Sequence, residues 1–90
     1  MKVKIIKLST GEELVSRCVE KEDEVILNKP MTLQAVQTNQ ANQVGMALMP
    51  WLMAGKCEEV VIKKSLIIAV DEPKDQAEKK YLSNVTGLSL

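Results

Sequence analysis

The side chains that could take part in chemistry are mainly carboxylates, because the chain of 90 residues contains no histidine. Without imidazole, the commonest general acid–base group and a frequent metal ligand are missing. The paired carboxylates Glu12/Glu13 and Glu58/Glu59 lie at turns or beside lysines, where solvent surrounds them. A glycosidase needs two carboxyl groups fixed across a cleft, one of them with a raised pKa, and solvated pairs do not provide this.

Hydroxyl and thiol groups are present as nucleophiles, but no histidine base can activate them. They are Ser9, Thr10, Ser16, Cys18 and Cys57. A lysine base is adjacent to a serine at Lys64-Ser65, yet neighbouring side chains on an extended chain point apart. The acidic run 20–24 lacks the alternate spacing and the glycine of a calcium loop. We therefore expect no catalytic residue, no metal site and no cofactor, and we expect that the protein is not an enzyme.

The two cysteines have no CxxC spacing, and no signal peptide precedes them. This pattern favours buried, reduced thiols in a cytoplasmic protein over a disulfide. The longest mainly apolar run, residues 44–54, is about half the length of a bilayer span and is interrupted by Pro50. We expect no membrane segment.

Charge is balanced over the whole chain, with 12 basic and 12 acidic residues. A neutral domain lacks the positive surface on which non-specific nucleic-acid binding depends. The balance hides an uneven distribution, because no charged residue lies between Lys29 and Lys56. Part of this uncharged stretch, residues 30–55, must fill the core, but it also concentrates Met and Trp, which are enriched at interfaces. Core packing and contact with another subunit both remain open for it.

Extended segments occupy the first 70 residues of the chain. Period-2 patterns and β-branched residues predict strands at residues 1–9, 13–21, 25–37, 44–52 and 66–70, with a further extended piece at 58–62. Gly11 suits the first hairpin turn, and the polar run 38–43 is expected to form a loop tip. Pro30 has no amide hydrogen to donate, so it must lie at a bulge, a bend or a sheet edge.

A helix is expected at about residues 73–83, followed by a frayed tail at 84–90. Asp71-Glu72-Pro73 is a helix start signal, and opposite charges recur at i, i+4 beyond it. The length allows a single domain, residues 1–90. Five strands with short connections and one C-terminal helix predict a mainly β fold, a small, strongly bent antiparallel barrel.

Several short motifs resemble those of the Sm-like (LSm) proteins. Residues 6–14, IKLSTGEEL, match the family's opening of hydrophobic residues around a glycine, here Gly11. Residues 30–34, 48–52 and 72–74 are similar to the divergent Sm-like proteins of marine phages. The resemblance implies an SH3-like barrel that assembles into a ring. The chain departs from the family where Ser16 replaces a second glycine, where the uridine-holding loop is reduced to Asp23 and Leu27-Asn28, and where the helix is C-terminal rather than N-terminal.

The resemblance implies a non-enzymatic, homo-oligomeric ring of five to seven copies, in the host cytoplasm if a phage encodes it. Asn28, Lys63 and Lys64 would be its contacts to single-stranded RNA, since amides and cations suit base edges and phosphates. Pairing of the fourth strand with the fifth strand of the next copy would close the ring. The expected interface residues are Val44, Met46, Leu48, Leu66, Ile67 and Ile68. The alternative is a structural or protein-binding phage component that binds no nucleic acid.

Overall fold

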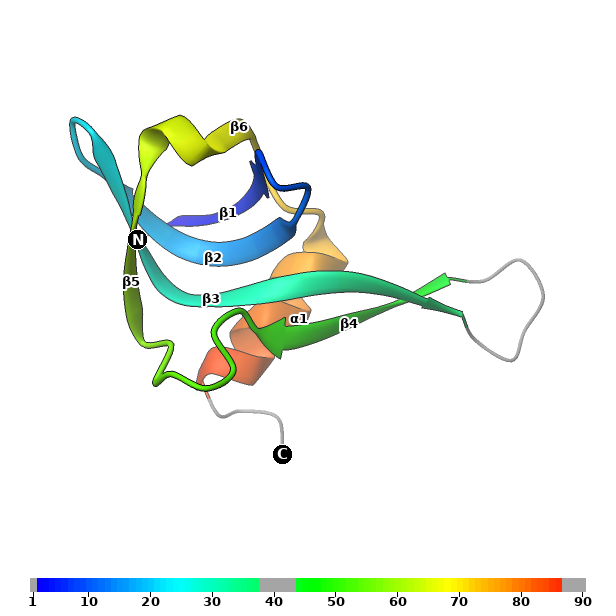
Figure 1. Cartoon of the computed structure of the whole chain (residues 1–90). Coiled ribbons are helices and arrows are strands. Elements are labelled where there is room, and N and C mark those ends of the chain that lie inside the picture. Colours follow the sequence, from blue (N-terminus) through cyan, green and yellow to red (C-terminus); the bar gives the residue numbers. More distant parts are fainter. Residues whose placement is uncertain (1, 38–43, 87–90) are drawn as a thin grey trace.

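The computed structural model describes residues 2–37 and 44–86, which form a bent antiparallel sheet and one helix (Figure 1). The loop tip expected at 38–43 lies outside the described residues. The elements, in chain order, are β1 (Lys2–Leu8), β2 (Glu13–Glu20), β3 (Glu24–Gln37), β4 (Val44–Pro50), β5 (Glu59–Lys63), the 3₁₀ turn η1 (Lys64–Leu66), β6 (Ile67–Asp71) and α1 (Asp75–Thr86). The mainly β fold with a single C-terminal helix is confirmed.

The sheet follows the order β4-β3-β2-β1-β6, and β5 pairs with β3 as well. The long strand β3 therefore has two partners on one side: residues 24–28 pair with β5 and residues 31–37 pair with β4. The fourth strand, expected at residues 44–52, ends at Pro50. The piece expected to be extended at residues 58–62 forms a separate strand, β5. Both strands continue the same edge of the sheet, so six strands occupy the five positions that the sequence predicted.

The neighbouring strands β2 and β3 both bend sharply, at residues that lie beside each other in the sheet. The register between these strands shifts between Val15 and Arg17, and on β3 the backbone of Lys29 has a positive φ of 52°. Pro30 follows at this bend, between the two halves of β3, and is buried. The expectation that a proline without an amide hydrogen must mark a bend is confirmed. The bend is what turns the flat ladder toward a barrel.

The apolar residues form two clusters, one on each face of the bent sheet. The first consists of Ile6, Leu8, Leu14, Val25, Leu27 and Ile62, with Cys18, Trp51, Val60 and Ile67 packed against it. The second consists of Val3, Val15, Met31 and Tyr81, with Ile5, Leu33, Leu48 and Val85 packed against it. Because consecutive strand residues point to opposite faces, β1 and β2 each contribute side chains to both clusters.

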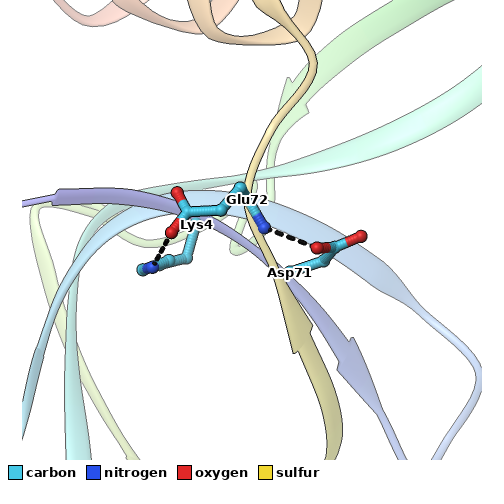
Figure 2. A network of polar contacts seen from close by, with 3 residues as sticks. All are labelled: Lys4, Asp71 and Glu72. Atoms are coloured by element: carbon cyan, nitrogen blue, oxygen red, sulfur yellow. Dashed lines mark hydrogen bonds and ion pairs between the residues drawn. The ribbon is translucent and has the colours of Figure 1, made fainter.

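The helix α1 covers the second cluster through Ala77 and Tyr81, both buried (Figure 1). It begins two residues later than expected and runs three residues further, to Thr86, so residues 84–86 of the expected frayed tail are helical. Val85, in the added turn, packs against the second cluster, and burial of this apolar side chain explains the longer helix. The connection before the helix is tied to β1, because Lys4 Nζ donates to Glu72 Oε1 at 2.6 Å (Figure 2).

Cys18 and Cys57 are free thiols, each only half-buried, so the expectation of fully buried cysteines is wrong. Cys57 lies in the connection between β4 and β5, where its Sγ lies 3.4 Å from both the Leu52 amide nitrogen and the Pro30 oxygen. The single helix of the described residues is too short and too polar to cross a membrane.

Candidate nucleic-acid interface

A hollow of about 700 Å³ lies between the β2–β3 turn and the junction of β5 with η1. It is lined by Lys21, Glu22, Asp23, Glu24, Lys63, Lys64 and Ser65. Glu24 and Lys63 are cross-strand partners, and the Lys64 amide donates to the Asp23 carbonyl at 3.0 Å. The fold thus brings Lys63 and Lys64, two of the three predicted RNA contacts, to one acidic turn.

Carboxylates balance the cations of this hollow. Lys64 Nζ lies 3.6 Å from Glu20 Oε2 and 3.4 Å from the carbonyl oxygen of Glu22, whereas Lys63 is exposed. The carboxylates of Glu20, Glu22, Asp23 and Glu24 are all exposed near three lysines. A single copy of the chain therefore presents no strong positive field to phosphate groups.

Asn28 lies at the opposite end of β5 from the two lysines. It pairs with Glu59, four residues along β3 from the pair that Glu24 forms with Lys63, which is about 13 Å at the usual rise per strand residue. Its side-chain Nδ2 donates to the Glu58 carbonyl at 3.4 Å. Within one copy, Asn28 and the lysine pair do not form a single site.

The predicted interface residues divide between exposed and packed positions. Ile68 and Leu66 are exposed, at 64% and 43%, while Ile67 packs against the first cluster. On β4, Met46 and Leu48 are half-buried, and Leu48 packs against the second cluster. Val44 pairs with Gln37 at the start of β4. Ile68 is therefore the most exposed of the predicted interface residues on β6.

Two exposed apolar residues that the sequence reasoning missed lie on β5 and β6. Val61 on β5 is 52% exposed and Val70 on β6 is 49% exposed. The signal for Val61 was present in the uninterrupted apolar run 60–62, which on a strand must place one side chain away from the core. That signal could be used only after residues 59–63 were known to form a separate strand.

The described residues hold no group of three or more Cys, Asp or Glu side chains that could bind a metal ion. Burial raises the pKa of the Cys18 thiol above its usual value, which keeps this group protonated at neutral pH. A protonated thiol is a poor nucleophile, so Cys18 is not set up for catalysis.

The strand order, the bend across β2 and β3 and the 3₁₀ turn before the last strand define a small, open, SH3-like β-barrel. In sequence, residues 5–82 match the Sm_like domain, and the chain belongs to this family. Its members often form oligomeric rings and bind RNA, and they are generally scaffolds rather than enzymes. No curated protein matches the chain.

Proposed function

We propose that the protein is a non-enzymatic ring subunit, assembled from five to seven copies, that binds single-stranded RNA beside its central pore. The observation that carries this proposal is a pair of short strands with unused edges and exposed apolar side chains. Within the described residues, β6 pairs only with β1 and β5 pairs only with β3. Unpaired edges of this kind are templates for adding a strand from another chain.

The two edges match each other in length and composition. Both β5 and β6 have five residues, and both carry exposed apolar side chains, Val61 on one and Ile68 on the other. Antiparallel pairing of β5 with β6 of the next copy would bring Val61 close to Ile68 within the contact. Such a contact joins two different surfaces, so repetition of it closes a ring when the rotation allows.

The edge of β4, which contains the predicted interface residues Val44, Met46 and Leu48, is the continuation of the β5 edge. One of its carbonyl groups is already occupied, because Lys80 Nζ donates to the Met46 oxygen. We therefore place the main contact at β5, with β4 beside it. The partner strand β6 supplies Ile67 and Ile68, and Leu66 lies directly before them at the end of η1.

Ring closure would compensate for the weak positive charge of one copy. Lys63 ends β5 and Lys64 begins η1, directly next to the proposed contact, so these lysines would recur around the ring axis. Repeated lysines raise the local concentration of phosphate more than one pair does. Asn28 would contribute an amide from the other end of β5, on a separate part of the RNA path.

The test is titration of labelled oligo-U and oligo-A with the wild type, Lys63→Ala/Lys64→Ala and the matched control Lys79→Ala. Lys79 is an exposed helix lysine outside the hollow. We expect the double variant to lose binding and to flatten the dependence of log K on log salt, while the control binds as the wild type does. Equal binding by all three proteins would contradict the proposed site.

The alternative function is binding of a protein, with no nucleic acid. The four carboxylates around Lys63 and Lys64 favour it, because they oppose phosphate. Failure of the wild type to bind either oligonucleotide at low salt would support this alternative. The closeness to marine phage proteins and the cytoplasmic location remain predictions.

A further inference from the structure

An apolar groove with an acidic rim lies where the sheet extends beyond the N-terminal end of α1. Its volume is about 420 Å³. The apolar lining comes from Ile5, Leu33, Met46 and Ala77, and the carboxylates come from Glu13, Asp71, Glu72 and Asp75. Lys74 is the single cation of the lining. The groove therefore suits an apolar side chain that is accompanied by a positive charge.

Two of the four carboxylates are already engaged inside the chain. Glu72 forms the ion pair with Lys4, and Asp71 Oδ1 accepts a hydrogen bond from the Glu72 amide at 2.8 Å (Figure 2). Asp75 is the first residue of α1, and it is exposed. It is the carboxylate best placed to meet an incoming cation.

The connection between β4 and β5 carries the matching chemistry. It contains Met53, the most exposed large hydrophobic side chain among the described residues at 73%, together with Leu52 at 41%. Lys56 is the one cation of residues 51–58, and it is exposed. Within the described residues, neither of the ion pairs found involves Lys56. Covering such an exposed methionine with an apolar surface is favourable, because it removes the side chain from water.

The proposed ring contact brings this connection to the groove of the neighbouring copy. Antiparallel strands run past each other, so the residues before β5 lie beside the residues after β6. Because β5 begins at Glu59 and β6 ends at Asp71, this contact would bring the 51–58 connection of one copy beside the segment that follows β6 in the next, and residues 74–77 of that segment line the groove. Both the apolar residue and the charge therefore arrive at the correct end of the groove.

We infer that the 51–58 connection of each subunit docks into the acidic groove of its neighbour, with Met53 on the apolar floor and Lys56 at the carboxylate of Asp75. This inference rests on the proposed ring, and it names the surface that completes each subunit contact. The occupant is a second copy of this chain, because the antiparallel direction of the strands, the exposed apolar area and the charge complementarity agree on the same partner segment.

The test measures the dissociation concentration of the assembly by analytical ultracentrifugation at low salt. Met53→Ser and Lys56→Glu should each raise it about tenfold, from lost apolar burial and from charge repulsion repeated at every contact. Asp75→Lys should raise it similarly. The double variant Lys56→Glu/Asp75→Lys should return to within about threefold of the wild type, because the pair is restored with its signs exchanged.

The matched control is Lys21→Glu, which reverses an exposed lysine of the β2–β3 turn outside the groove and should leave the dissociation concentration unchanged. An assembled wild type whose variants all dissociate at the wild-type concentration overturns the docking inference and leaves the ring intact. A double variant no tighter than the single variants also overturns it. A wild type that is monomeric at every concentration overturns the docking inference together with the ring.

Discussion

Two hydroxyl groups, those of Ser16 and Tyr81, meet at the bend where the β2–β3 ladder is interrupted. The Tyr81 hydroxyl donates to the Asn28 carbonyl at 2.7 Å and accepts from the Arg17 amide at 3.1 Å. Ser16 Oγ lies 3.1 Å from the same Asn28 oxygen and 2.8 Å from the Arg17 carbonyl oxygen. A register shift leaves backbone groups without strand partners, and these side chains satisfy them. The Ser16 hydroxyl thus holds backbone carbonyl groups of both strands at the bend.

Loss of the Tyr81 hydroxyl should destabilise the fold without changing its apolar packing. We expect Tyr81→Phe to lower the free energy of unfolding by about 1 to 3 kcal/mol, because the Asn28 carbonyl and the Arg17 amide lose a buried partner. Urea denaturation at neutral pH measures this, with the exposed-site variant Lys79→Ala as control. A loss no larger than that of the control would show that the hydroxyl does not hold the bend.

Tyr81 also makes the free energy of unfolding depend on pH in the alkaline range. Burial raises the pKa of Tyr81, so the folded chain holds this proton more tightly than the unfolded chain does. Tyr81 therefore contributes its full stabilisation below its pKa in the unfolded chain, near 10. This stabilisation is lost as the pH rises through its pKa in the folded chain. Burial also raises the pKa of Cys18, and the stabilisation that depends on the protonated Cys18 thiol begins to be lost near pH 9. Urea denaturation between pH 8 and 11 should therefore show a shallower decline for Tyr81→Phe than for the wild type; equal slopes would contradict this assignment.

At the scale of elements, the sequence predicted local structure well and pairing less well. The helix signal at residues 71–73 was sufficient to locate α1, because capping and i, i+4 charge pairs are local. The pairing of β5 with the first half of β3 was not predictable in the same way, because it lies beyond the bend at Lys29, whose positive φ residues other than glycine rarely adopt. Asn28 and the lysine pair were predicted as contacts of one RNA site, and their separation follows from the register of β5 with β3, which the sequence did not predict.

The two adjacent isoleucines of β6 should respond differently to substitution by aspartate. Ile68→Asp places a charge at an exposed site, so we expect a folded chain that does not assemble. Ile67→Asp places a charge against the first core cluster, so we expect a loss of stability of about 3 kcal/mol or more. Light scattering combined with circular dichroism separates the two effects. An Ile68→Asp protein with the wild-type mass would exclude β6 from the subunit contact.

For the whole molecule, the position of the charged residues along the chain is more informative than the net charge of zero. Inside the uncharged stretch 30–55, Leu33, Leu48 and Trp51 pack against the two clusters, which confirms the core interpretation for these residues. Trp51 also donates from Nε1 to Glu12 Oε2 at 2.8 Å, which fixes the first hairpin turn to the end of β4. Leu52 and Met53 remain exposed, and contact with a second copy is our explanation for them.

The central claim is that this chain is a ring subunit, and the molar mass of the wild type in solution tests it most directly. The chain has a mass of 10.0 kDa, so multi-angle light scattering at micromolar concentration should give one species of about 50 to 70 kDa, the mass of five to seven copies. Ile68→Asp, measured alongside, should give the mass of one folded chain. A wild-type mass of one chain at every concentration would contradict the ring and the strand contact that builds it.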